Sequence, residues 1–220
     1  MTPAPVRAAF VQALQEGWAG GAGAFLPAGF FAGAAMLVPF VLGPDTAILA
    51  AVGPGILWAA LALASLVTME RLFQADLEDG ALDLWLAVDA PLSAISGAKA
   101  LAHWIVSGLP LVLLSPLLSL ALGAPADGVL EAGLLYGIGG LAFFLWGGFG
   151  AALSAGVRRG GLLIALIALP FYVPTAIFGA LALAAGTPWP PEALYLCAAT
   201  LFALAVAPFA TASALRLAAD

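Results

Sequence analysis

Long apolar runs separated by short polar segments dominate the chain. Six such runs cover residues 24–42, 47–69, 100–122, 132–156, 162–184 and 193–215. Each is close to or longer than the roughly 20 residues that a helix needs to cross about 30 Å of hydrocarbon. Backbone polar groups in lipid must be paired internally, and the two-residue alternation of a membrane barrel is absent. The pattern predicts an all-α polytopic membrane protein with six transmembrane helices.

The composition supports this prediction and excludes two other classes of protein. The chain is 64% hydrophobic and only 8% charged, whereas a soluble domain carries roughly 25% charged residues on its water-facing shell. A nucleic-acid-binding protein would need a basic patch, but no basic run exceeds two residues. The expected surroundings are therefore the lipid bilayer, with no nucleic acid.

The positions of the basic residues predict the orientation in the membrane. Three connections between the runs hold acids and no Lys or Arg. The six basic residues fall only in the alternate segments: Arg7, Arg71, Lys99, Arg158, Arg159 and Arg216. Under the positive-inside rule, both termini and the two basic connections are cytoplasmic.

The N-terminal segment, residues 1–23, has a helical pattern of its own. Val6, Phe10, Leu14 and Trp18 recur every four positions, which favours an amphipathic helix lying in the membrane interface over an ordinary polar tail. We therefore divide the chain into this segment, a six-helix permease domain over 24–216 and a cytoplasmic tail over 217–220.

Residues 70–99 form the longest polar stretch, on the predicted cytoplasmic side. They hold eight of the eighteen charges. We expect the second membrane helix to project to about Asp79, Gly80 to break it, and a short helix to follow. Pro91 then opens the next helix, with Asp89 as a possible cap.

This cytoplasmic segment has the composition of a coupling element that contacts a partner. Such an element needs apolar side chains for grip and charges for register. The apolar candidates are Leu72, Phe73, Leu82, Trp85 and Leu86, and the acidic ones are Asp76, Glu78, Asp79 and Asp83. A merely solvated loop is the alternative.

Prolines interrupt several predicted spans. An interior proline removes a backbone hydrogen bond and kinks the helix. We expect kinks at Pro54, Pro110, Pro170 and Pro174, and favour curved packing over a hinge at these positions.

Several kinds of chemistry are missing from the sequence. No acidic or basic residue lies well inside a predicted span, which disfavours an ion-coupled carrier. Lys99 is not part of a GxxxxGK[ST] loop, so the chain is not itself an ATPase, and we expect no enzyme activity or bound cofactor. His103 is the single histidine; we interpret it as a polar residue at the membrane boundary, like Lys99, in preference to a haem ligand or a titrating group.

Two sets of motifs resemble known families. The stretch Glu78-Asp79-Gly80-Ala81-Leu82-Asp83-Leu84-Trp85-Leu86, followed by Pro91, resembles the E-x-G-[TS]-L-[ED]-x-L-L…P signature of ABC-2-type exporter permeases. The wider resemblance, over about 50–216, is to the haem exporter protein B family, CcmB. It rests on Gly53-Pro54-Gly55-Ile56-Leu57-Trp58, Glu70-Arg71-Leu72-Phe73, Lys99-Ala100-Leu101-Ala102-His103-Trp104, Arg159-Gly160-Gly161-Leu162-Leu163 and Pro208-Phe209-Ala210-Thr211-Ala212.

The resemblance implies a transport system of cytochrome c maturation in the bacterial inner membrane. This chain would be its permease subunit, in two copies, with a CcmA-like ATPase that binds ATP. Its other partners would be CcmC- and CcmD-like membrane proteins and a CcmE-like haem chaperone, and the complex would handle haem. The resemblance places the ATPase contact at Glu70 to Leu86, which includes Arg71 and Gly80.

Two other functions stay open on the sequence. An ABC-2-type exporter of a lipid, drug or polysaccharide would share the coupling helix but lack a neighbouring gene for a haem chaperone. A non-energised membrane scaffold would not stimulate a co-purified ATPase.

Overall fold

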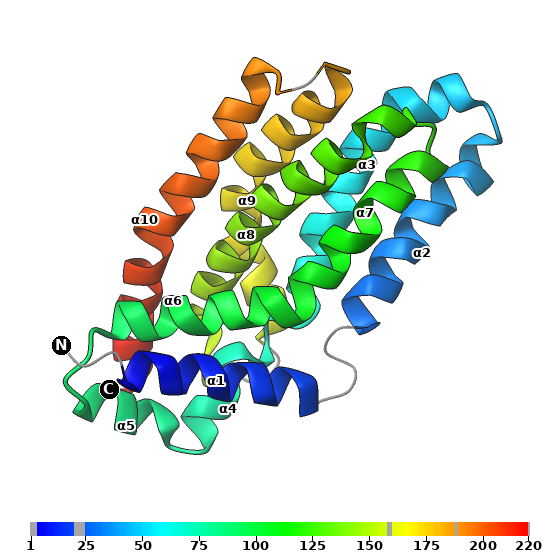
Figure 1. The fold of residues 1–220 in the computed structure, drawn as a ribbon. Helices are drawn as coiled ribbons and strands as arrows, with labels where there is room; N and C mark the ends of the chain where they lie inside the picture. The colour runs from blue at the N-terminus through cyan, green and yellow to red at the C-terminus, as the bar shows by residue number, and fades with distance from the viewer. Residues whose placement is uncertain (1–3, 20–24, 158–159, 188, 220) are drawn as a thin grey trace.

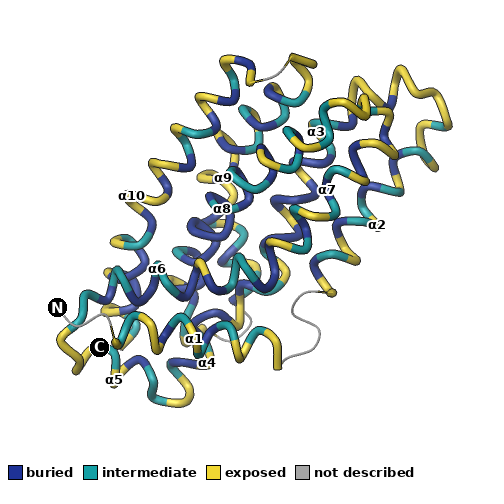
Figure 2. The backbone as a smooth tube through the Cα atoms, in the orientation of Figure 1, coloured by how far each residue is buried: buried dark blue, intermediate teal, exposed yellow. Residues whose placement is uncertain are grey.

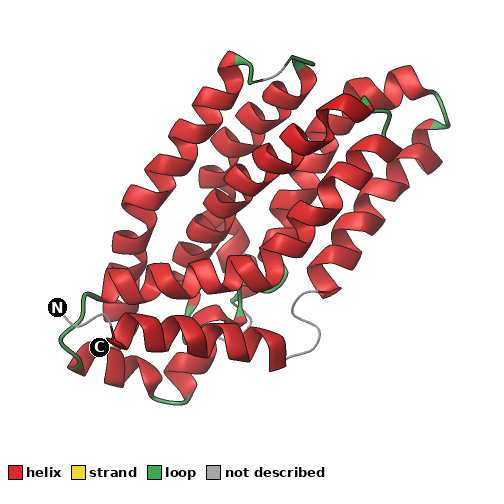
Figure 3. Cartoon of the chain, viewed as in Figure 1, coloured by secondary structure: helices red, strands yellow, loops and turns green. Residues whose placement is uncertain are grey.

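The computed structural model describes residues 4–19, 25–157, 160–187 and 189–219, and these contain helices, turns and loops but no strand (Figure 3). Arg158 and Arg159, which contribute to the predicted orientation, lie outside the described residues. The elements are α1 (Ala4–Ala19), α2 (Phe25–Leu42), α3 (Thr46–Leu66), α4 (Arg71–Glu78), α5 (Ala81–Ala87), α6 (Leu92–His103), η1 (Trp104–Gly108), α7 (Leu109–Ala121), η2 (Ala126–Gly128), α8 (Val129–Ser154), α9 (Gly161–Ala184) and α10 (Pro191–Ala219).

The predicted six membrane spans are confirmed. Six helical segments among the described residues are long and apolar enough to cross a bilayer: Phe25–Leu42, Thr46–Glu78, Leu92–Ala121, Ala126–Ser154, Gly161–Ala184 and Pro191–Ala219. Figure 1 shows α2, α3, α7, α8, α9 and α10 running roughly alongside one another. The helices α1, α4, α5 and α6 lie across one end of this bundle, beside both chain termini. We call these four helices the base; by the basic residues that it carries, it is the predicted cytoplasmic end.

The third span begins later than the sequence indicates. Its predicted start at residue 100 falls inside α6, which Figure 1 shows lying across the bundle beside α1, while α7 rises through it. The direction changes at η1, a π-helical segment in which the Leu109 N–H donates to the Trp104 carbonyl. The proline at position 110 follows directly and has no N–H to continue the ladder. Hydropathy did not reveal the bend because α6 is itself rich in Ala and Leu.

The second helix, predicted to continue to about Asp79, is interrupted by a turn at residues 67–70. The helix α3 ends at Leu66, and a turn separates it from α4, which carries the chain on to Glu78. Gly80 has φ 74°, a left-handed conformation that favours glycine, and it separates α4 from α5 as predicted. The proposed Asp89 cap is wrong: Pro91 occupies the N-cap position of α6 and no side chain caps this helix.

The helix α8 is the centre of the bundle. It contacts α3, α4, α6, α7, α9 and α10, and buried positions follow one another along its length (Figure 2). Around it, the outward faces of the other spans expose apolar side chains such as Phe40, Leu162 and Leu194. Exposed apolar side chains at this density are expected where the surroundings are lipid. The helices α3 and α9 run through Pro54, Pro170 and Pro174 without interruption.

The N-terminal helix is present, and it packs through small residues. Ala9 and Ala13 are buried, and α1 contacts α6 and η1. Gly17 completes this row, since a Cβ on it would lie 3.0 Å from the Val106 side chain. Trp18, by contrast, is 67% exposed. Val6, Phe10 and Leu14 of the predicted apolar row are half-buried, so only its end at Trp18 is fully open, and the position of this helix in the membrane interface stays a prediction.

Candidate functional site

The base holds most of the residues predicted to contact a partner. The helices α4 and α5 form a hairpin around Gly80, and α4 packs against α8 and α6. Leu72, Phe73 and Leu82 are buried within this chain. Their side chains anchor the hairpin to the bundle and are not available as grip for a partner in this conformation.

A buried ion pair lies at the centre of the base. The Lys99 Nζ on α6 donates to both carboxylate oxygens of Asp76 on α4, with 2.6 Å to Oδ1. Lys99 is 1% and Asp76 2% exposed. Removing one partner from such a pair leaves an uncompensated buried charge, which costs about 3–5 kcal/mol. The structure therefore assigns Asp76 an internal partner, where the sequence analysis expected a contact with another protein.

Two further side chains approach the same ammonium group. The ring of Trp85 on α5 lies 4.5 Å from the Lys99 Nζ, within range of a cation–π interaction. The Glu16 Oε2 on α1 lies 3.9 Å from it. Lys99 thus contacts one residue from each of the other three base helices.

The sequence analysis missed this cluster, although it named Lys99 and Asp76 separately. They are 23 positions apart on different helices, so no helical periodicity connects them. The available signal was the presence of the chain's single lysine and a group of acids in one predicted cytoplasmic segment.

The outward face of the hairpin is both apolar and acidic. Leu84 is 69% exposed, and Leu86 and Val88 are also exposed. The hairpin and its two ends also carry five exposed acids: Glu70, Glu78, Asp79, Asp83 and Asp89. We call this set, with Arg71, the docking face. The predicted apolar face of Leu82, Trp85 and Leu86 is split, since Leu82 and Trp85 face the bundle and Leu84 takes their place outside.

His103 is held by other parts of the chain. Its Nε2 is hydrogen-bonded to the Thr68 Oγ1 at 2.9 Å, and its ring centroid lies 5.5 Å from that of Phe144. Thr68 belongs to the turn between α3 and α4. His103 therefore ties the end of α6 to that turn, and the described residues contain no group of three potential metal ligands.

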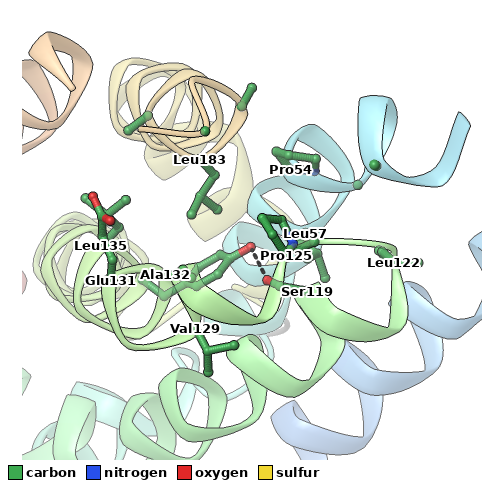
Figure 4. Close-up of a pocket in the computed structure, with 18 of the residues that line it drawn as sticks. Pro54, Leu57, Ser119, Leu122, Pro125, Val129, Glu131, Ala132, Leu135 and Leu183 are labelled. Atoms are coloured by element: carbon green, nitrogen blue, oxygen red, sulfur yellow. Dashed lines mark hydrogen bonds between the residues drawn. The ribbon is translucent and has the colours of Figure 1, made fainter. Parts of the chain in front are cut away.

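A cavity of about 310 Å³ opens at the opposite end of the bundle. Figure 4 shows it among α3, α7, α8 and α9, with Leu57, Leu135 and Leu183 on its walls. The hydroxyls of Ser119 and Tyr136 lie 3.4 Å apart within it. Glu131 lines the same cavity and accepts a hydrogen bond from the Trp189 N–H. Nothing in the sequence pattern predicted this cavity, because its walls come from four separate helices.

Comparisons with known proteins give a consistent result. The family model described as "CcmB protein" matches residues 8–218. A Heme exporter protein B from Paracoccus denitrificans is 44% identical over 217 residues, which cover 96% of this chain and 99% of that protein. The proteins of the same name from Rhodobacter capsulatus and Escherichia coli K12 are 45% and 42% identical, covering 90% and 87% of this chain and 92% and 88% of their own lengths. The match extends from the base through all six spans, and this chain belongs to the CcmB family.

Proposed function

We propose that this multi-pass protein is the permease subunit of an ABC transporter complex for cytochrome c biogenesis. It couples ATP hydrolysis by a partner ATPase to haem delivery, through release of the haem-loaded periplasmic chaperone. Its relatives are named as haem exporters. Six apolar spans and a compact base are the parts that such a subunit needs. The haem is handled by the complex, and ATP is bound by the partner.

The docking face is the observation that carries this proposal. Leu84 and Leu86 on the short helix α5, and Val88 directly after it, are large exposed apolar side chains of the base. At the centre of a protein interface such side chains supply contact area, and the surrounding acids favour a partner with basic residues. A solvated loop would not need three large exposed apolar residues within five positions outside the span region.

The complex has further proposed members. The ATPase is CcmA-like, and the membrane partners are CcmC- and CcmD-like. The chaperone is CcmE-like, two copies of this chain are present, and the membrane is the bacterial inner membrane. The docking face lies at the end of the bundle that carries the basic residues, which supports a cytoplasmic ATPase.

This chain transmits force and does not ligate haem iron in the proposal. His103 is the single histidine in the sequence, and its Nε2 is hydrogen-bonded to Thr68. The ABC-2-type exporter of a lipid, drug or polysaccharide is disfavoured by the names of the relatives. The scaffold alternative also needs a surface that binds proteins, and it differs in that it would not stimulate a co-purified ATPase.

Charge reversal on the docking face tests the proposal. Asp79 and Asp83 are exposed, so Asp79→Lys with Asp83→Lys leaves the core intact. We expect this variant to insert normally but to lose the co-purifying ATPase and cytochrome c maturation. Glu192→Lys, on the first turn of α10 at the other end of the bundle, is the matched control and keeps both. Unchanged ATPase co-purification and maturation in the double variant would count against the assignment.

A further inference from the structure

Lys99 is buried at a point where the four base helices meet. It is the single lysine of the chain, and α6 places its ammonium group between α1, α4 and α5. The docking face lies on the outer side of α4 and α5, so Lys99 is one layer further in. A partner bound to the docking face does not reach Lys99 directly, but any displacement of α5 changes the surroundings of its charge.

The ion pair is not explained by stability alone. A buried pair pays a desolvation cost that its attraction only roughly offsets, and well-packed apolar residues of similar size often stabilise a fold as well or better. An apolar pair would therefore hold α4 on α6 equally well. With a charge at this position, the energy of the base depends on exactly where the surrounding charged and aromatic groups lie.

The helix that carries Lys99 leads directly into the membrane. It continues without a break through η1 into α7, and Figure 1 shows that the helix axis turns there from the base into the bundle. A movement of α6 at Lys99 is thus passed to a membrane span. The helix axis already changes direction at η1, and π segments are among the known sites of helix kinks, so we take η1 as the joint at which the angle between α6 and α7 changes.

Glu16 offers the ammonium group a second carboxylate. Its Oε2 is 3.9 Å from the Lys99 Nζ, while the Asp76 Oδ1 is at 2.6 Å. Charge-assisted hydrogen bonds span about 2.7–2.9 Å, so a shift of about 1 Å brings Lys99 into a bond with Glu16. Gln12, one turn earlier, donates to the Glu16 Oε1 at 2.7 Å and holds this carboxylate in position.

The helix that carries Glu16 is fixed to α6 independently of the hairpin. Ala9 and Ala13 of α1 are buried, and Gly17 of the same helix lies against Val106 of η1. Asp76 and Trp85, in contrast, belong to the hairpin that carries the docking face. One carboxylate would thus move with the hairpin, and the other would stay with α6.

We propose that Lys99 is the positioning residue that passes movement of the α4–α5 hairpin into α6 and α7, by shifting between Asp76 and Glu16. This inference rests on the proposed function and adds an internal step to it. When the partner draws the hairpin outward, Trp85 and Asp76 withdraw from the ammonium group, and Glu16 takes up its charge. The N-terminal helix then forms part of the coupling path.

A paired substitution separates this role from a purely structural one. Asp76→Asn or Lys99→Met alone leaves one buried charge unpaired and is expected to lower thermal stability. Asp76→Leu combined with Lys99→Met removes both charges and restores packing. We expect this double variant, purified with its partner ATPase in lipid nanodiscs, to retain partner binding but to stimulate ATP hydrolysis at least about fivefold less than the unmodified chain. Full stimulation by the double variant would overturn the proposal.

Glu16→Gln tests the second carboxylate without disturbing the core, because Glu16 is 48% exposed. We expect unchanged membrane insertion, thermal stability and ATPase co-purification, with stimulation of ATP hydrolysis reduced about fivefold or more. Gln15→Ala, at the adjacent exposed position of α1, is the control and keeps full stimulation. Equal stimulation by the Glu16→Gln and Gln15→Ala variants would overturn the proposal, even if the double variant failed to fold.

The outcome is distinguishable from failure of the proposed function. If the docking face does not bind an ATPase, the docking-face charge reversals leave co-purification unchanged. If the docking face binds but Lys99 does not transmit, those reversals abolish binding while the Lys99 and Glu16 variants stimulate normally.

Discussion

The indole ring of Trp58 lies directly against Gly179, so that a Cβ on this glycine would fall 2.3 Å from the ring atoms Cε2 and Cζ2. Gly139 of α8 approaches the neighbouring ring atoms Cη2 and Cζ3, from which a Cβ would lie 2.4 and 2.5 Å away. Trp58 is fully buried and stacks on Tyr136, with ring centroids 5.0 Å apart. These two glycines therefore let α3, α8 and α9 close around a single large side chain.

Gly179→Ala should destabilise the bundle, because neither the helix backbone nor the buried ring has room to shift. Overpacking of this kind costs about 1–3 kcal/mol. Thermal unfolding of the purified protein in detergent provides the measurement. Gly29→Ala in α2 is the control, since a Cβ there meets nothing within 4 Å. Equal unfolding temperatures for the two variants would contradict the described packing.

Leu82 and Leu84 should give opposite phenotypes, although they are two positions apart on α5. Leu82 is 2% exposed and Leu84 is 69% exposed. Leu82→Ala leaves a cavity in the core and is expected to cost about 2–5 kcal/mol of stability. Leu84→Ala should leave the unfolding temperature unchanged and weaken ATPase co-purification. Loss of co-purification in the Leu82 variant alone would show that the docking face is misassigned.

Features that leave a clear local pattern could be predicted from the sequence, and features without one could not. The six spans were predictable because burial in lipid leaves long apolar runs. The break at Gly80 was predictable because a left-handed residue favours glycine. The direction in which Leu82 and Leu84 point was not, since a helix of seven residues with apolar side chains on both faces has no clear period.

Contacts between residues far apart in the chain could not be predicted from the sequence either. Lys99 on α6 and Asp76 on α4 are separated in the chain by Gly80, α5 and a turn. The orientation of these two helices follows from their packing on α8 rather than from the local sequence. The same holds for α6, of which the sequence analysis placed residues 92–99 in the polar segment and residues 100–103 in a span. It packs on α1, whose row of small residues allows close approach, and on α8 and α10.

Tyr136→Phe should be tolerated. The substitution removes the hydroxyl that lies 3.4 Å from Ser119 but keeps the ring that stacks on Trp58. The loss of one net hydrogen bond corresponds to about 1 kcal/mol, a small decrease in unfolding temperature. The control is Tyr195→Phe, because Tyr195 is 56% exposed and its hydroxyl is not part of the core. A destabilisation of about 3 kcal/mol or more would contradict the assignment of one ordinary hydrogen bond to this hydroxyl.

The orientation of the base can be measured by cysteine labelling. The single cysteine, Cys197, is half-buried, so Cys197→Ala gives a background without thiols. Into it, Gln15→Cys places a thiol on the exposed side of α1, and Ala126→Cys places one at the exposed start of η2, at the other end of the bundle. The distribution of basic residues predicts that a membrane-impermeant maleimide added to spheroplasts labels position 126 at once.

Position 15 should react only after the membrane is permeabilised, because a docking face for a nucleotide-dependent partner must lie in the compartment that holds ATP. Labelling of position 15 in intact spheroplasts would place the docking face outside the cell and remove the physical basis for coupling through Lys99.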